Sequence, residues 1–220
     1  SLDNRMIYEQ TGVSTYQRIG VSYASLGKFE VAIEFLEKAL EIEYDDAVAF
    51  ELATILYDQK EYQKANLYFK QIDTISPEFE GYEYGYALSL HAEHQTEEAL
   101  RLTQQGLSKN PFDTRLLLLA SQFSYELHDE QKAEDYLLKA KDNAEDLEEI
   151  ALRLSNLYLE QERFDEVLKF EEQDIDNVLT KWNIARAYQA LEQTTAALEQ
   201  YRLLLSDLKE NPEFLEQYIY

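Results

Sequence analysis

The sequence predicts an all-α fold in which helix-turn-helix units stack along the chain as a solenoid. Three observations lead to this prediction. Small residues recur at a period near 34, apolar residues between them follow helical spacing, and proline falls only between the predicted helices. A fixed period of this length is typical of stacked helical repeats, in which each unit buries its apolar face against its neighbours.

Two series of small residues define the repeat. The first is Gly20, Ala53, Ala87, Ser121, Ser155 and Ala185, with spacings of 33, 34, 34, 34 and 30. The second is Ala32, Ala65, Ala99, Ala133, Val167 and Ala197, with the same five spacings. Because a large side chain would hold two helix backbones apart, we expect these residues to lie where the paired helices approach most closely.

Each unit is predicted to hold two helices joined by a tight turn. In the first unit, Ile19, Tyr23 and Leu26 have helical spacing, and a second apolar series runs from Phe29 to Leu40. Gly27 lies between the two, where a reversing chain needs a residue that tolerates positive φ.

The repeat divides the chain into six predicted units followed by a partial one. Residues 1–12 are read as the remnant of a preceding repeat, and the fifth unit is four residues short, so its second helix is expected to be truncated. Proline suits the start of a helix, and Pro77, Pro111 and Pro212 lie between units. The predicted units are 13–45, 46–79, 80–113, 114–147, 148–177 and 178–211, with 212–220 as the first helix of a seventh.

At these positions the chain resembles the tetratricopeptide repeat family, whose pattern combines small, aromatic and proline residues. The first unit matches at Gly20, Tyr23, Gly27, Phe29, Ala32, Leu36 and Ala39, and the second at Leu52, Ala53, Tyr62, Ala65, Phe69 and Pro77. The later units keep fewer of these residues. The resemblance implies a right-handed superhelical α-solenoid of about six units plus a partial seventh. The apolar last helix suggests a piece of a longer bacterial array.

The charge of the chain limits the classes of partner. Acidic residues outnumber basic ones 44 to 20, for a net charge of −24. Nucleic acids and anionic membranes are therefore not expected as partners. The charge favours either the attraction of basic partners or a solubilising coat. There is no cysteine, which argues against disulfides and favours a cytoplasmic location.

No pattern in the sequence indicates catalysis, a cofactor or a metal. His91 and His94 could lie on one helical face, but His94 and His128 are 34 residues apart, at the turn position of Gly27. Histidine is enriched at positive φ, so a turn explains this spacing better than a metal site does. Glycine-rich phosphate loops and nucleophile elbows are missing. The chain is therefore expected not to be an enzyme.

The resemblance also implies a concave groove lined by the first helix of each unit. The expected groove residues are Phe50, Tyr57, Tyr84, Leu88, His91, Leu118, Tyr125, Leu152, Asn156, Leu159, Trp182 and Arg186, with Asp58, Glu126 and Glu160 at its rim. The equivalent positions elsewhere carry Gln17, Val21, Ala24, Thr54, Gln122 and Gln189. Such a groove would suit a peptide with apolar anchors and basic flanks. Alternatively, its aromatic residues pack against the neighbouring repeat.

These expectations define a non-catalytic scaffold that binds a peptide or partner protein. A peptide-sensing domain of a larger bacterial regulator is the alternative, and self-assembly through the array ends is a third possibility. Family members that grip an acidic chaperone tail use cationic groove residues. Gln17, Val21, Phe50 and Thr54 occupy those positions here, so binding to such a tail is not expected.

Overall fold

The computed structural model describes residues 15–72, 79–173 and 175–219, and all regular secondary structure within these ranges is helical. The chain divides into two compact units, residues 1–111 and 112–220. The expected remnant at residues 1–12 and Pro77 lie outside the described residues. No helix in the described part of the chain is long and apolar enough to cross a bilayer.

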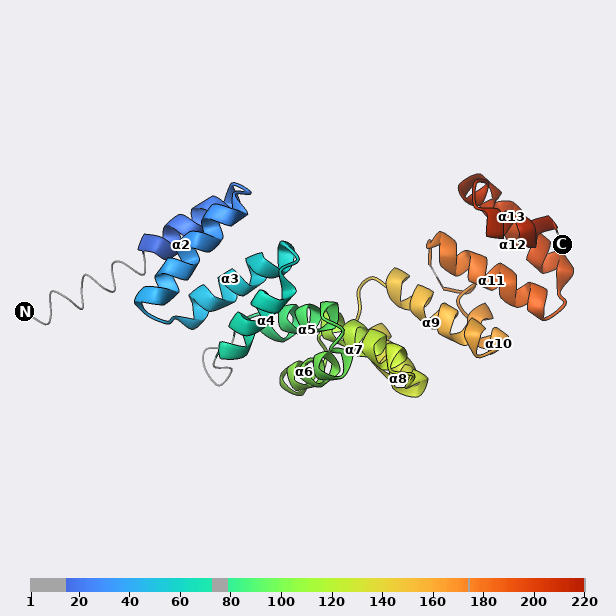
Figure 1. The fold of residues 1–220 in the computed structure, drawn as a ribbon. Coiled ribbons are helices and arrows are strands. Elements are labelled where there is room, and N and C mark those ends of the chain that lie inside the picture. The colour runs from blue at the N-terminus through green and yellow to red at the C-terminus, as the bar shows by residue number, and fades with distance from the viewer. Residues whose placement is uncertain (1–14, 73–78, 174, 220) are drawn as a thin grey trace, which may run out of the picture. The chain divides into compact units, whose positions relative to one another are not determined.

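The described residues of the first compact unit form three pairs of helices, which can be followed in Figure 1. Neighbouring pairs pack through contacts of α2 with α3 and of α4 with α5. The helices are residues 15–25 with α2 (Phe29–Ile42), α3 (Asp46–Asp58) with α4 (Tyr62–Gln71), and α5 (Tyr82–Ala92) with α6 (Thr96–Lys109).

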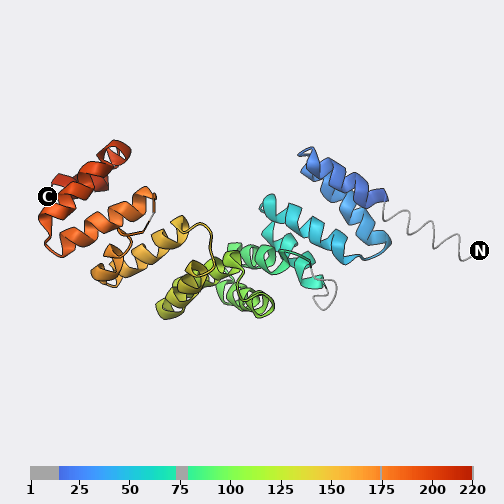
Figure 2. The same cartoon turned by 180° about the vertical axis from the view of Figure 1, so that it is seen from behind.

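The second compact unit contains three further pairs and a last helix, also seen from behind in Figure 2. Here α8 packs on α9, α9 on α11, and α12 on α13. The helices are α7 (Thr114–Glu126) with α8 (Glu130–Lys141), α9 (Glu148–Glu160) with α10 (Phe164–Leu168), α11 (Val178–Ala190) with α12 (Thr194–Leu208), and α13 (Pro212–Ile219).

Every pair turns through one residue with a left-handed backbone. Gly27 has φ 71°, and His94 and His128 both have φ 60°, as the sequence predicted. In the first turn the amide of Lys28 donates to the carbonyl of Tyr23 at 2.9 Å. Such a bond satisfies a carbonyl that the end of a helix leaves open. The corresponding turns place Lys60, Glu162 and Glu192 at φ 63°, 56° and 57°.

The small residues lie where two helices meet, which confirms the reading of the first unit. A Cβ added at Gly20 would lie 2.7 Å from Cγ of Leu36, and Leu36 is fully buried. Ala32, Ala53 and Ala65 are also fully buried. These positions exclude larger side chains because the interior is already filled.

Polar side chains cap the N-termini of several helices that begin a pair. An aspartate or asparagine at the N-cap satisfies amides that have no partner within the helix. Asp45 accepts from the amide of Val48, and Asp113 from the amides of Arg115 and Leu116. Asn177 caps α11, and Asn211 accepts from the amide of Phe214 just after Pro212.

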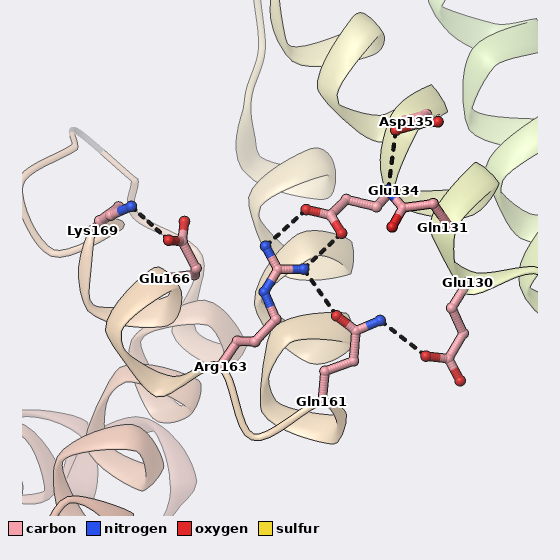
Figure 3. A network of polar contacts seen from close by, with 8 residues as sticks. All are labelled: Glu130, Gln131, Glu134, Asp135, Gln161, Arg163, Glu166 and Lys169. Atoms are coloured by element: carbon pink, nitrogen blue, oxygen red, sulfur yellow. Dashed lines mark hydrogen bonds and ion pairs between the residues drawn. The ribbon is translucent and has the colours of Figure 1, made fainter.

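The second helix of the fifth pair is truncated, as expected from the short repeat. α10 has five residues, whereas α8 has 12 and α12 has 15. A polar network joins the start of α10 to α8 (Figure 3). There, the guanidinium of Arg163 binds both carboxylate oxygens of Glu134, which is 7% exposed.

Candidate functional site

The expected groove residues of the first compact unit are mostly engaged in packing. The ring of Phe50 stacks on Phe79 with centroids 5.3 Å apart, and the ring of Tyr57 lies 5.6 Å from that of Tyr62. Burial raises the pKa of Tyr57 above its ordinary value. Three further residues, Tyr84, Leu88 and His91, are half-buried on α5, and Asp58 is exposed at the end of α3.

Trp182 is covered by the last helix of the second unit. Its side chain is 8% exposed, and its Nε1 donates to Oε1 of Gln217 at 2.9 Å. The indole also meets the ring of Phe214 edge-on, with centroids 5.8 Å apart, while the Arg186 guanidinium lies 6.0 Å from its centre. For this residue the structure favours the alternative of packing against the neighbouring helix, because α13 occupies the surface of its ring.

Three other expected residues come together around a pocket of about 270 Å³ in the second unit. Tyr125, Asn156 and Glu160 line it, and we call it the α7–α9 pocket. Its complete lining is Ser121, Gln122, Tyr125, Ala133, Leu137, Arg153, Asn156, Leu157 and Glu160. Among the lining residues, Tyr125, Asn156 and Glu160 are exposed. Side chains at its mouth are therefore accessible to a ligand.

The floor of the pocket is apolar and formed by small or medium side chains. Ala133, Leu137 and Leu157 are at most 3% exposed, and Ser121 is buried beside them. The backbones of α7 and α9 approach one another less closely than those of α9 and α11. The pocket therefore opens between α7 and α9, which are the first helices of two successive pairs. The second helix of the earlier pair, α8, lies beneath it.

Different side chains occupy the equivalent positions two repeats earlier in the chain. Phe69, in the first compact unit, occupies the same position of the repeat as Leu137 does in the second compact unit. The Phe69 ring reaches Gly85, where an added Cβ would lie 3.6 Å from Cζ. The position of Gly85 corresponds to that of Arg153, two repeats later. Leu137 is smaller than Phe69, whereas Arg153 is larger than Gly85, so the two repeats fill this space with different side chains.

Hydrogen bonds hold the side chains at the mouth. The hydroxyl of Tyr125 donates to Oε2 of Glu160 at 2.5 Å, bridging α7 and α9. This bond to the carboxylate raises the pKa of Tyr125, because it stabilises the protonated phenol. Asn156 accepts from Nδ2 of Asn183 through its Oδ1 at 2.7 Å. Its side-chain NH₂ group thus remains a donor at the mouth.

Arg153 lines the pocket, but its charge is already compensated. Its Nε and Nη2 both bind Oε1 of Glu149, and its Nη1 donates to the carbonyl of Leu118 at 3.3 Å. Sequence reasoning missed Arg153 and Leu157. The spacing of residues 153, 157 and 160 on one helical face was the signal that could have found them.

The remaining expected residues lie beside the pocket or away from it. Leu118, Leu152 and Leu159 are half-buried, and Glu126 is exposed and accepts from Nε2 of Gln122 at 3.0 Å. Within the described residues, no group of three or more histidine, aspartate or glutamate side chains is arranged to hold a metal ion. The arrangement therefore offers an open pocket with one apolar and one acidic side.

Two family descriptions match opposite ends of the chain. "Tetratricopeptide repeat" matches residues 13–46, and "YpiA-like, C-terminal tetratricopeptide repeats" matches residues 179–220. The chain carries tetratricopeptide repeats at both ends. A curated relative, the TPR repeat-containing protein YpiA of Bacillus subtilis, is 22% identical over 211 residues. The match covers 94% of this chain. It covers only 50% of the relative, so the chain spans about half of the relative's length.

Solved structures of other proteins share the fold. The C-terminal part of a TPR repeat-containing protein from Cytophaga hutchinsonii has a TM-score of 0.73 at 16% identity, covering 88% of this chain and 79% of that one. PilF from Pseudomonas aeruginosa has a TM-score of 0.68 at 18% identity, covering 96% and 97%. At these identities the likeness concerns the fold alone.

Proposed function

We propose that this chain is a non-catalytic scaffold that binds a segment of a partner protein at the α7–α9 pocket. Tetratricopeptide repeats generally serve as protein–protein interaction scaffolds, and the fold carries no function of its own beyond the surfaces that it presents. The observation that supports the proposal is the pocket itself. Residues expected to contact a partner lie there on both α7 and α9, around an open space. Trp182, by contrast, is covered.

The chemistry of the pocket suits a peptide better than it suits a cofactor. Pockets for drug-sized ligands and cofactors usually enclose about 300–1,000 Å³, and this one encloses about 270 Å³. A protruding side chain fits such a volume, with the neighbouring peptide backbone lying along the mouth. The NH₂ group of Asn156 is placed to donate to a carbonyl of that backbone.

The charge of the chain supports a protein partner rather than nucleic acid. With 44 acidic and 20 basic residues, the chain repels phosphate backbones at neutral pH. A cytoplasmic location is part of the same proposal and rests on the absence of cysteine. No observation favours the alternative of a peptide-sensing domain in a larger regulator.

Affinity capture with matched variants tests the proposal. The bait is the purified chain, and the lysate comes from the organism that encodes it. The pocket variant Tyr125→Ala/Asn156→Ala removes two exposed side chains at the mouth. The control Leu138→Ala/Arg202→Ala removes two exposed side chains on α8 and α12 that do not line the pocket. Circular dichroism first shows that both variants remain helical.

The expected result is a partner held by the wild type and by the control but lost by the pocket variant. A partner held equally by all three proteins would place the binding surface elsewhere and contradict the proposal. The same conclusion would follow if the control and the pocket variant both lost the partner while remaining folded.

A further inference from the structure

We propose that the α7–α9 pocket receives a single basic side chain, lysine or arginine, from the bound segment. This inference rests on the proposed function and names the chemistry of the residue that anchors the partner. It is carried by three features of the pocket: its apolar floor, the acidic groups at its mouth, and the hydrogen bonds that prepare those groups.

The floor matches the stem of a long side chain. Ala133, Leu137 and Leu157 present only hydrocarbon, and each is buried under the pocket. Lysine and arginine bury their methylene groups against such surfaces while they keep the charged end near water. A short acidic side chain would leave the floor unfilled.

The charges around the mouth favour a cation. Glu160 lines the pocket, and Glu130 lies close enough to Tyr125 to raise the pKa of its phenol further, although less than Glu160 does. The one cationic side chain in the lining, Arg153, is already bound by Glu149 and by the carbonyl of Leu118. The mouth therefore has a negative charge that no lining residue neutralises.

Glu160 is already oriented for a ligand. The Tyr125 hydroxyl occupies Oε2, while Oε1 accepts no hydrogen bond from the described residues. Gln122 donates through Nε2 to Glu126, so its amide oxygen is likewise a free acceptor among the described residues. Two acceptors without donors suit an ammonium or guanidinium group, which brings several donors and no acceptor. Because Tyr125 holds the carboxylate, less side-chain entropy is lost when a cation binds.

Titration of the full chain with N-acetyl-arginine amide tests the inference. N-acetyl-citrulline amide has nearly the same shape without the charge and serves as the comparison ligand. Nuclear magnetic resonance follows the side-chain amides of Asn156 and Gln122, which lie in the lining. Glu160→Gln removes the charge while it keeps an acceptor for Tyr125. Glu145→Gln, at an exposed residue between α8 and α9, is the matched control for the loss of one charge.

We expect arginine amide to shift both side-chain signals saturably and citrulline amide to bind about fivefold more weakly. Glu160→Gln should weaken this binding about fivefold, as the loss of an exposed charge pair does, and Glu145→Gln should not. Raising the salt concentration to about 0.5 M should weaken it as well, because screening reduces the attraction. Equal shifts with citrulline, or equal affinity for Glu160→Gln and the wild type, would overturn the inference.

The two proposals can fail separately. A captured partner that is lost by Tyr125→Ala/Asn156→Ala but is held by Glu160→Gln would support the binding surface and refute the basic anchor. Specific binding of arginine amide without any loss of the partner in the pocket variant would refute the proposed function while the pocket's preference for a cation stands.

Discussion

Arg163 binds both oxygens of the Glu134 carboxylate, with Nη1 2.6 Å from Oε2 and Nη2 3.0 Å from Oε1. The pair joins α8 to the residue that precedes α10, the truncated second helix of the fifth repeat (Figure 3). The same guanidinium lies over the ring of Tyr158, 4.4 Å from its centre, and donates to Oε1 of Gln161. Bidentate pairing and ring stacking together fix the direction in which the chain enters α10.

Replacing Arg163 with methionine should lower the free energy of unfolding by about 1–2 kcal/mol. The variant keeps the aliphatic stem but leaves a nearly buried carboxylate without its partner. The expected loss is at the low end for buried pairs, because the Arg163 side chain is itself 39% exposed. Urea unfolding followed by circular dichroism measures this loss.

The exposed pair of Lys169 and Glu166 in Figure 3 provides the control for this variant. Lys169→Met should change the free energy of unfolding by less than about 0.5 kcal/mol. The double variant Glu134→Gln/Arg163→Met should be more stable than the sum of the two single effects predicts. Strict additivity would show that the two side chains do not stabilise one another.

The Glu134–Arg163 pair should also make stability depend on pH in the acidic range. The hydrogen bonds from Arg163 hold the pKa of Glu134 below its usual value, which is about 4.3 for glutamate. A depressed folded-state pKa contributes stability above the unfolded pKa, and that stability is lost as the pH falls through the folded value. The difference in stability between wild type and Arg163→Met should therefore be constant above about pH 5 and should shrink below about pH 4.

Unfolding at several pH values measures this difference. Comparison with the variant is essential because the other acidic residues also titrate in this range. A difference that stays constant down to about pH 3 would contradict the assignment of the low pKa to this pair.

Glycine at the left-handed turn residues should stabilise the protein. Glu162 and Glu192 are exposed and have φ of 56° and 57°, a conformation that costs a residue with a Cβ about 1–2 kcal/mol. Replacement by glycine would remove this cost. Part of the resulting gain in stability is lost, because glycine increases the conformational entropy of the unfolded chain. Glu162→Gly and Glu192→Gly should each raise stability by about 0.5–1 kcal/mol.

Calorimetry should show a rise of a few degrees in the melting temperature for each of these glycine variants, about 2–4 °C per kcal/mol in a chain of this size. Glu162→Ala and Glu192→Ala are the controls, because they remove the same side chain but keep the Cβ. If alanine stabilises as much as glycine, the gain comes from the loss of charge and not from the backbone.

The fluorescence of Trp182 should report whether α13 is docked. Phe214 is fully buried and its ring meets those of Trp182 and Tyr201. Phe214→Ala should detach α13, because this eight-residue helix loses its central apolar contact. The indole would then meet water, so its emission should shift to the red and acrylamide should quench it more strongly. The exposed Glu216 gives the control, Glu216→Ala.

Because the chain contains one tryptophan, this signal has a single source. An unchanged spectrum in Phe214→Ala would mean that α13 stays in place or does not shield Trp182. The exchange rates of the α13 amides would separate these two cases, since a detached helix loses its protection.

The sequence predicted the repeat well because packing at small residues leaves a periodic pattern. The positions of Gly20, Gly27, His94 and His128 each followed from a local requirement, either space between helices or positive φ. The truncation of α10 followed from the length of its repeat. These features depend on neighbours at fixed separation along the chain, and periodicity can find them.

The candidate site was predicted only in part. Whether an expected groove residue is open or covered depends on which side chains reach it from another helix. Trp182 is covered by Phe214 and Gln217 of α13, and Leu137 of α8 forms part of the pocket floor. The repeat pattern treats both residues as ordinary apolar positions. Their effect appears only when the helices are placed beside one another.

The left-handed residues also indicate how a repeat array can tolerate deletion. Their spacing along the chain is 33, 34, 34, 34 and 30, so the short repeat keeps its turn at Glu162 and loses its residues only after that turn. The Arg163 cross-link lies at the start of the shortened helix, next to the turn that is kept. Four residues are thus missing between the turns at Glu162 and Glu192 while every turn is kept, so the array accommodates a change of repeat length without losing a turn.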